Sequence, residues 1–509
     1  MKKVRNFFKL IFSRLFLVAL LVILQVALIV FFAIYLTSSY LYFAILSSAI
    51  GLLILIWVIN KKIHPEHKLM WAFLMLLFPF FGVTLYAVLS INKPTKKQSN
   101  KYFSFDKSLI KNNDQYYQKI YDISNEYQGQ IKYLENTTKM FASKNNDCSF
   151  FPDGKSFYDS LINDIKQAND FIFMEYFIIR PGVMWNSILE ILIEKVKQGV
   201  EVRLIYDDVG CARYLKGNYY KYLNSLGIKC VKFNKMLPFI VSYHNNRDHR
   251  KITVIDGKIA YTGGINFGDE YINLSNEFGY WKDNAIKIKG DAVDNFTVLF
   301  LQNFSIASKT IIDYSPYLKK CDNTIVNDEI AFPFGTGPRF YYENMAVDIF
   351  LNLINQAKKS IDISSPYLVM DHSLTNALIN AKNRGVKVRV LVPNKPDKRF
   401  VYCFTKQSVI DLANHGIEVY LYTPGFNHAK SILIDDTIAY IGTTNLDFRS
   451  LLHHYECGTL LINCKCLKQI DENFIKDFEE SNLIEKDEIK MNFFEKLFVS
   501  FFYIFKSLL

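Results

Sequence analysis

Three long stretches near the N-terminus consist almost wholly of apolar residues, whereas the rest of the chain alternates short apolar segments with amphipathic ones. The apolar runs cover residues 15–36, 40–59 and 69–91. Each is about as long as a helix that crosses the hydrocarbon layer of a bilayer. We therefore expect a helical membrane region over residues 1–100. A cleaved signal peptide fits less well, because two further runs follow the first.

Charges beside these runs bear on which side of the membrane holds the remainder. Eight Lys and Arg residues lie before the first run and between the second and third, against four after the third. This bias favours an inside N-terminus, and three crossings would place the rest of the chain outside. The eight cysteines show no dense disulfide pattern, which favours a reducing compartment. Both observations agree if the third run, which contains Pro79 and Gly82, is re-entrant, so both orientations stay open.

Beyond the apolar runs the pattern changes to alternating strands and helices. Residues 101–140 are polar and predict a juxtamembrane linker with some helix. Residues 171–179 and 199–208 have the pattern of buried strands, and residues 188–196 between them have helical spacing. This order is typical of an α/β fold, in which helices cover a largely parallel sheet.

The same order of elements returns later in the chain. "LINDIKQANDFIFMEYF" from Leu161 is echoed by "LINQAKKSIDISSPYL" from Leu353, and "GVEVRLIY" is echoed by "GVKVRVLV". We expect two homologous lobes over residues 141–310 and 330–485, each with a mixed, largely parallel sheet flanked by helices. Residues 488–509 repeat apolar positions at helical spacing, which predicts an amphipathic helix against the bilayer or, alternatively, against the lobes.

Two similar stretches carry the candidate chemistry, namely "HRKITVIDGKIAYTGGIN" from His249 and "HAKSILIDDTIAYIGTTN" from His428. Five pairs of identical residues are 179 positions apart: His249 and His428, Lys251 and Lys430, Asp256 and Asp435, Asn266 and Asn445, Glu277 and Glu456. With a likelihood of about one in twenty for each match, coincidence is far below about one in ten thousand. The repeat therefore predicts two related half-sites, one in each lobe.

The spacing suggests a phosphate site. Residues i and i+2 of a strand project to the same face, so His249 and Lys251 point together. An imidazole beside an ammonium binds an anion and supplies a titratable group. Asn266 and Asn445, after glycine turns, can add hydrogen-bond donors to the same anion.

The acidic residues of the motif have two expected roles. Glu277 or Glu456 can hold an imidazole by its other nitrogen and fix its tautomer. Asp256 and Asp435 lie where a strand turns, so we expect them to be mainly structural. Two half-sites that face each other supply one histidine to attack phosphorus and another to protonate the leaving oxygen, with no cofactor and no metal ion.

Two features of the composition, the cysteines and the net charge, raise the alternatives of a metal site and of nucleic-acid binding. Cys464 and Cys466 with Cys457 could bind a metal, but no second cysteine pair or histidine has the spacing that a zinc site needs. The formal net charge of +11 suits a surface that meets anionic lipid, although charge alone also permits nucleic acid.

The doubled HxKxxxxD motif resembles the phospholipase D superfamily, and the chain resembles bacterial cardiolipin synthases over almost its whole length. The stretches that carry the resemblance are "HPEHKLMWAFLMLLFPFFGVTLYAVL", "NNRDHRKITVIDG", "TGGINFGDEY" and "NHAKSILIDDTIAYIGTTNLDFRSL". Two features depart from the family. "WKDNA" from Trp281 stands where the family usually has Trp-Arg-Asp-Thr-His, and the first apolar run is additional.

The resemblance implies two phospholipase D-like lobes that build one active site in a multi-pass protein of the bacterial cell membrane. It implies a phosphatidyltransferase that makes cardiolipin and glycerol from two phosphatidylglycerol molecules through a phosphohistidine. The expected partners are phosphatidylglycerol and anionic membrane lipid, not nucleic acid. The candidate catalytic residues are His249, Lys251, Asp256, His428, Lys430 and Asp435, and the candidate phosphate-binding or orienting residues are Asn266, Glu277, Asn445 and Glu456. The family order implies His249 as nucleophile and His428 as general acid.

Three other functions are weighed against this one. A phospholipase D or a phosphatidylserine synthase would differ only in using water or another acceptor alcohol. A nuclease would use the basic charge to bind DNA, but the apolar runs would hold its site at lipid. A lipid-binding scaffold would not need intact copies of every motif residue, so an enzyme is favoured.

Overall fold

The computed structural model describes residues 37–61, 63–90, 106–235, 245–318, 324–338, 341, 344–486 and 488–508, with the single positions 23, 27, 30 and 31. The chain divides into two compact units. The first comprises residues 1–95, 236–245 and 501–508, and the second comprises residues 96–235, 246–500 and 509. The expected apolar run 15–36 lies outside the described residues except at those single positions.

The first unit contains the helices α3 (Thr37–Ile59), α4 (Pro65–Leu77) and α5 (Pro79–Ser90). The third apolar run is therefore two helices. Pro79 begins α5, a position where its missing N–H costs nothing. A Cβ on Gly82 would lie 2.7 Å from the Leu74 carbonyl oxygen, so only glycine fits there. Within the described residues, no helix combines the length and apolarity that a membrane span requires.

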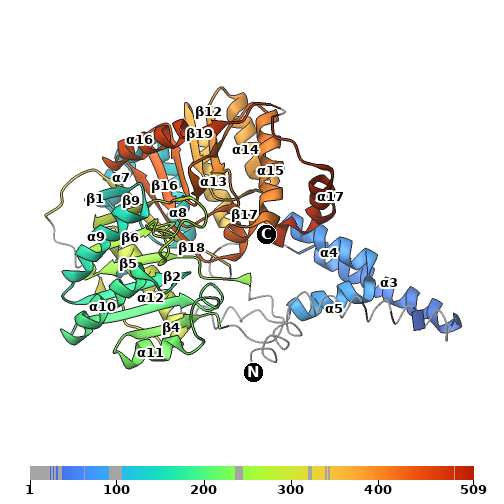
Figure 1. Ribbon diagram of the computed structural model, residues 1–509, viewed down its shortest axis with the longest axis horizontal. Coiled ribbons are helices and arrows are strands. Elements are labelled where there is room, and N and C mark those ends of the chain that lie inside the picture. The colour runs from blue at the N-terminus through green and yellow to red at the C-terminus, as the bar shows by residue number, and fades with distance from the viewer. Residues whose placement is uncertain are drawn as a thin grey trace. The chain divides into compact units, whose positions relative to one another are not determined.

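The described part of the second unit contains two large sheets with helices packed on them (Figure 1), together with two small two-stranded sheets. The first sheet has seven strands in the order β1-β8-β6-β5-β2-β3-β4. Its elements are β1 (Asn146–Phe151), α9 (Gly154–Lys166), β2 (Phe171–Tyr176), α10 (Val183–Lys197), β3 (Glu201–Asp207), α11 (Tyr219–Ser225), β4 (Lys229–Phe233), β5 (Lys251–Ile255), β6 (Ile259–Gly263), β8 (Ala285–Gly290) and α12 (Val293–Ser308).

The second sheet has eight strands in the order β19-β13-β12-β10-β15-β16-β18-β9. Its elements are β9 (Ile330–Thr336), α13 (Met345–Gln356), β10 (Ser360–Ser364), α14 (His372–Asn383), β12 (Lys387–Pro393), α15 (Arg399–Asn414), β13 (Glu418–Tyr422), β15 (Ser431–Ile434), β16 (Ile438–Gly442), β18 (Glu456–Ile462), α16 (Cys466–Glu479), β19 (Ser481–Leu483) and α17 (Phe493–Phe502). Short pieces complete the unit: η1 (Lys107–Leu109), α7 (Asp114–Ser124), η2 (Asn125–Tyr127), α8 (Gln128–Thr138), β7 (Tyr280–Lys282), η4 (Ser315–Tyr317), β11 (Leu368–Val369), β14 (Gly425–Asn427), β17 (Leu446–Asp447) and η5 (Arg449–His453).

The α/β class and the mixed sheets are confirmed, but the sheets are not largely parallel. Only β2, β3 and β4 run parallel in the first sheet, and only β10, β12 and β13 do so in the second. The other neighbours are antiparallel. The reason is that the motif strands β5 and β6, like β15 and β16, join through tight turns instead of helical crossovers, and tight turns reverse the chain.

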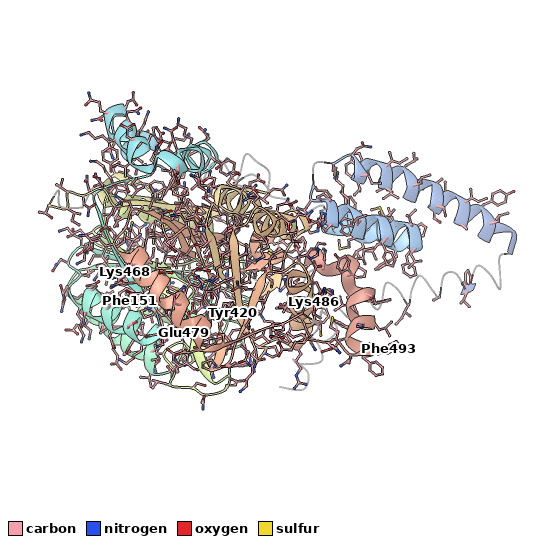
Figure 2. All side chains as sticks on the ribbon, turned by 90° about the horizontal axis from the view of Figure 1, so that it is seen from above. Phe151, Tyr420, Lys468, Glu479, Lys486 and Phe493 are labelled. Carbon is pink, nitrogen blue, oxygen red and sulfur yellow. The ribbon has the colours of Figure 1, made fainter. Side chains whose placement is uncertain are left out.

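One helix connects the two sheets. α12 is buried along most of its length, and its buried polar residues Asn295 and Asn303 donate hydrogen bonds to Pro333 and Glu175. It contacts β2 and β5 of the first sheet and β9 of the second. On another side α16, which carries Lys468 and Glu479, packs against β1 (Figure 2). The two lobes therefore share packing on more than one side.

The two motif aspartates fix the turns after β5 and β15. The Asp256 carboxylate accepts hydrogen bonds from the backbone N–H groups of residues 169–171 at 2.8 to 2.9 Å. The Asp435 carboxylate accepts from those of residues 358–360 at 2.6 to 2.8 Å. Both aspartates adopt left-handed backbone conformations, with φ of 53° and 51°. These contacts agree with the structural role that the sequence suggests.

This structural role predicts that substitution of Asp435 destabilises the protein more than substitution of the neighbouring Asp436. Asp435→Asn keeps the shape and tolerates the left-handed conformation, but it removes charge-assisted hydrogen bonds worth roughly 2 kcal/mol in the free energy of unfolding. Asp436→Asn is the matched control, because Asp436 is exposed and also left-handed, and we expect a change below about 0.5 kcal/mol. Urea unfolding followed by tryptophan fluorescence measures both. Equal losses would contradict the structural role.

Candidate active site

Each motif histidine is attached to the opposite lobe through its backbone. The His249 N–H, just before β5, donates to the Tyr455 carbonyl oxygen at 2.9 Å. The His428 N–H, just before β15, donates to the Lys282 carbonyl oxygen at 2.7 Å. Short parallel pairings support these bonds, between β14 and β7 on one side and between Asp248 and Tyr455 on the other. The two motifs therefore begin where the lobes meet.

The histidine side chains make the same crossed contact. His249 Nδ1 lies 2.9 and 3.0 Å from the two carboxylate oxygens of Glu456. His428 Nδ1 lies 2.6 Å from Asp283 Oδ2. A neutral imidazole beside a carboxylate carries its proton on the nitrogen that faces it, so each ring has a basic Nε2 available for chemistry. All four side chains are buried.

Asp283 is the structural counterpart of Glu456, which corrects the expectation for Glu277. In the first sheet Gly263 pairs with Ala285, and in the second Gly442 pairs with Gly458. The paired glycines differ by 179 positions, but 285 and 458 differ by 173, so the first lobe has six more residues in this loop. Glu456 therefore corresponds to Asp283. Glu277 lies exposed in the longer loop, and its match at 179 positions is coincidental.

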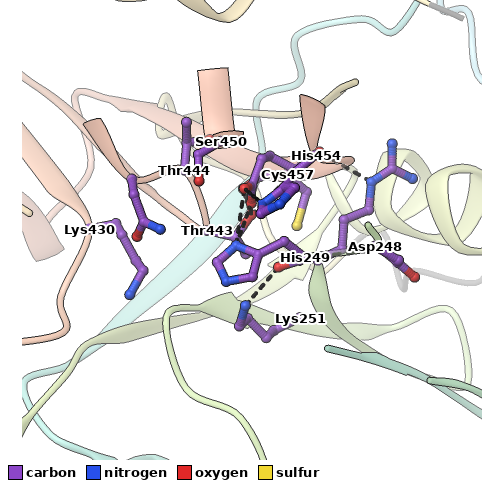
Figure 3. Close-up of polar contacts among 12 residues, drawn as sticks. Asp248, His249, Lys251, Lys430, Thr443, Thr444, Ser450, His454 and Cys457 are labelled. Carbon is purple, nitrogen blue, oxygen red and sulfur yellow. Dashed lines mark hydrogen bonds and ion pairs between the residues drawn. The ribbon is translucent and has the colours of Figure 1, made fainter. Parts of the chain in front are cut away.

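Both motif lysines are buried within this site. Lys251 Nζ donates to the His249 carbonyl oxygen at 2.7 Å, and Lys430 Nζ donates to the His428 carbonyl oxygen. Figure 3 shows the side chains of Lys251 and Lys430 extending toward the region in front of His249. Burial lowers the pKa of Lys251 to about 8 and, with repulsion from Lys251, that of Lys430 to about 7. The two motif lysines, one from each lobe, therefore lie in the same region of the protein.

The two motif asparagines differ. Asn266 is engaged within the protein, because its Oδ1 accepts from the Ile178 N–H at 3.0 Å and its Nδ2 donates to the Tyr271 hydroxyl at 2.7 Å. Asn445 Nδ2 makes only a long contact of 3.4 Å to Asp447, and its Oδ1 has no hydrogen-bond partner. Asn445 is therefore the better candidate for binding a ligand, and Asn266 supports the loop after β2.

Two residues beside Glu456 were missed by the sequence reasoning. The Thr443 hydroxyl donates to Glu456 Oε2 at 2.5 Å. The His454 ring lies 5.5 Å from the His249 ring, and its Nδ1 lies 3.5 Å from Glu456 Oε1 (Figure 3). The only signal in the sequence was their position next to the motif, since His454 precedes Glu456 by two residues.

Burial decides the protonation states of the ligand-free site. It lowers the pKa of His249 to about 3, against the opposing charge of Glu456, and it lowers that of His428 well below its usual value. Burial raises the pKa of Asp283 to about 6. Burial also raises the pKa of Glu456, but the contact with His249 lowers it by more, so that this pKa lies below its usual range. Neutral imidazoles among buried cations form a site for an anion with a basic nitrogen in it.

Among the described residues, two groups offer ligand atoms close enough to hold a metal ion, with atoms within 4.8 Å of one another. One is His249, His454 and Glu456, where the hydrogen bonds described above already occupy the carboxylate. The other, Cys148, Glu329 and Cys464, lies outside this site.

Comparisons with known proteins bear on both the fold and the family. The family model described as "Cardiolipin synthase, PLD-like domain" matches residues 161–302 and 350–478. An uncharacterised protein of Streptococcus mutans is 34% identical over 446 residues, 86% of this chain and 95% of that protein. A cardiolipin synthase of Alkalihalophilus pseudofirmus is 33% identical over 459 residues, 89% of this chain and 90% of that protein. The solved phosphatidylserine synthase of Haemophilus influenzae shares the fold, with a TM-score of 0.58 at 16% identity over 76% of this chain and 100% of that chain.

The sheet register makes a prediction about three acidic residues. Asp283→Asn cannot stabilise a cationic His428, so turnover of a phosphodiester should fall by about 100-fold or more. Glu456→Gln should do the same through His249. Glu277→Gln is the control and should keep the activity of the unchanged chain, because its side chain is exposed. Steady-state rates with a labelled phospholipid measure all three. A loss in Glu277→Gln as large as in Asp283→Asn would overturn the assignment.

Proposed function

The chain belongs to the cardiolipin synthase family of phospholipase D-like proteins, and from this membership we propose that it transfers a phosphatidyl group between two phosphatidylglycerol molecules, giving cardiolipin and glycerol. The observation that carries the proposal is the pair of crossed contacts, His249 with Glu456 and His428 with Asp283. Two imidazoles, each oriented by a carboxylate and each followed by a buried lysine, support phosphodiester exchange at an anion site.

The first half-reaction forms a covalent intermediate. His249 Nε2 attacks the phosphorus of one phosphatidylglycerol, and the bond from phosphorus to the glycerol oxygen breaks. An alkoxide is a poor leaving group near neutral pH, so a protonated His428 donates its proton to that oxygen and glycerol departs. Lys251 and Lys430 stabilise the negative charge that gathers on the phosphoryl oxygens.

The second half-reaction reverses these roles. His428, now neutral, takes the proton from a hydroxyl group of the second phosphatidylglycerol. That oxygen attacks the phosphorus, the bond to His249 breaks, and cardiolipin is formed. The two imidazoles carry every proton and bond change, so no step requires a metal ion.

The bound substrate supplies the charge that His428 needs to act as an acid. In the ligand-free site burial lowers its pKa first, and repulsion by Lys430 and Lys251 lowers it further. A phosphodiester anion between these groups offsets that repulsion and raises the pKa again. Asp283, on the other side of the ring, stabilises the imidazolium that results.

We further propose that the chain is held at the bacterial cell membrane by residues 1–100 as a multi-pass region and by α17. Large apolar side chains are exposed along α3, α4 and α5, including Leu46, Leu53 and Leu76. On α17 one face meets α15 through Phe498, whose ring lies 4.9 Å from that of Phe400. The other face leaves these side chains exposed: Phe493, Phe494, Leu497 and Phe501. A helix with one docked and one exposed apolar face suits a bilayer surface.

The two histidines should fail in different ways. With a nitrophenolate leaving group, which needs little protonation, His428→Ala should still form the phosphoenzyme and release about one equivalent as a burst. Turnover should then stall, because no base remains to activate the acceptor. His249→Ala should give no burst with any leaving group. Rapid-mixing absorbance measures the burst, and phosphate on His249 identifies the intermediate.

Other outcomes of the same experiment have definite meanings. A burst from His249→Ala and none from His428→Ala would reverse the two roles. Steady turnover by both variants would contradict the two-histidine mechanism. With labelled phosphatidylglycerol as the only lipid, phosphatidic acid in place of cardiolipin would contradict the proposed acceptor.

The membrane proposal predicts graded release. A chain lacking residues 1–100 should remain partly in the membrane fraction through α17, and removal of residues 488–509 as well should release it. Within the shorter truncation, Phe494→Ser should weaken binding to vesicles of phosphatidylglycerol and phosphatidylcholine. Val326→Ser, which alters another exposed apolar residue, is the control and should not. Full release of the chain lacking only residues 1–100 would contradict the role of α17.

A further inference from the structure

Three cysteines and one glutamate from distant parts of the sequence meet where the two lobes pack together. Cys148 lies in β1, at the edge of the first sheet, and Glu329 directly precedes β9, at the edge of the second. Cys464 follows β18, and Cys466 begins α16. The sulfur atoms of Cys148 and Cys464 and a carboxylate oxygen of Glu329 all lie within 4.8 Å of one another.

This cluster lies apart from the active site. β18 begins at Glu456 in the active site and ends at Ile462, two residues before Cys464. At about 3.3 Å per residue, the strand separates the two places by roughly 20 Å. Whatever the cluster binds is therefore not in contact with the reacting groups.

The cluster is buried and incompletely satisfied. Glu329 is only 5% exposed, and its Oε2 has no hydrogen-bond partner. A buried carboxylate oxygen without a hydrogen-bond partner destabilises the folded protein. The Cys464 thiol interacts with the thiols of both Cys148 and Cys466, and it lies 3.4 Å from the Ile330 carbonyl oxygen. A cation among these groups would satisfy the unpartnered Glu329 Oε2.

The donor set identifies the class of cation. Sulfur ligands favour soft metal ions, whereas Mg²⁺ and Ca²⁺ require oxygen. Three thiolates and one carboxylate make a closed four-coordinate set of ligand types that zinc accepts. Each thiol releases a proton to solvent when it binds, and the resulting charge equals that of a site with four cysteines.

We propose that Cys148, Glu329, Cys464 and Cys466 bind one zinc ion, which fixes the edge of the first sheet to the second. The sequence alone pointed to Cys457 as a companion of Cys464 and Cys466. Cys457 instead lies with its sulfur 3.4 Å from the Thr262 hydroxyl. The fold supplies Cys148 and Glu329 in its place, from 316 and 135 positions before Cys464. A disulfide between Cys148 and Cys464 would use the same thiols but would leave the Glu329 carboxylate unsatisfied.

The test is the metal content of the full chain, purified in detergent under reducing conditions and supplied with zinc. Mass spectrometry of the metal should find about one zinc per chain, as expected for a single closed site. Cys148→Ser and Cys464→Ser should lose it, and Glu329→Gln should weaken its affinity by about 10- to 100-fold. Cys230→Ser is the matched control, because Cys230 is equally buried in β4 of the same sheet, away from the cluster. It should retain the ion.

A second measurement keeps the test decisive if a variant folds poorly. Cobalt added to the unchanged reduced chain should give a near-ultraviolet band from thiolate-to-cobalt charge transfer. Absence of that band, or zinc content in Cys148→Ser equal to that of the unchanged chain, would overturn the proposal. A disulfide between Cys148 and Cys464 in protein isolated without reductant and without zinc would overturn it as well.

Discussion

Each reactive imidazole depends on a carboxylate that the other lobe supplies. His249 lies just before β5 in the first lobe, but Glu456 begins β18 of the second. His428 precedes β15 of the second lobe, but Asp283 lies between β7 and β8 of the first. Neither lobe therefore contains a complete half-site. The extensive packing of α12 against both sheets follows as a requirement, since a shift of about 1 Å between the lobes would break both contacts.

The same constraint explains why so much charge is buried at the junction. Two lysines, two carboxylates and two imidazoles lie in a region from which water is largely excluded. Such groups cost stability unless they are paired, and the lysines repel each other. The site is therefore preorganised for an anion, and a phosphodiester restores the balance when it binds. The buried charges lower the stability of the ligand-free protein. The same charges stabilise the negative charge that develops on the phosphoryl group during transfer.

The sequence allowed better predictions of the chemistry of the site than of its geometry. The doubled His-x-Lys pattern predicted one shared site, and the buried strand patterns predicted the α/β class. The direction of the strands was wrong, because periodicity marks a strand without saying what it pairs with. The role of Glu277 was wrong because a fixed offset assumes loops of equal length, and only the pairing of β6 with β8 reveals the six extra residues. The proximity of Cys148 to Cys464 could not be predicted from the sequence, because no sequence pattern links an edge strand of one lobe to the start of a helix in the other.

The two half-sites have the same arrangement of residues but differ in electrostatics. This difference favours His249 as the nucleophile and His428 as the general acid. Glu456 is held ionised by His249 and receives a further hydrogen bond from Thr443. A histidine that becomes a cationic phosphoimidazole needs a partner that stays charged throughout, which suits His249. Burial instead raises the pKa of Asp283 to about 6, so its charge responds to the groups around it. A histidine that must gain and lose a proton in each cycle is better served by such a partner than by a permanently ionised one. The asymmetry thus supports the proposed roles, attack by His249 and proton transfer by His428, between which the repeated sequence motif alone could not choose.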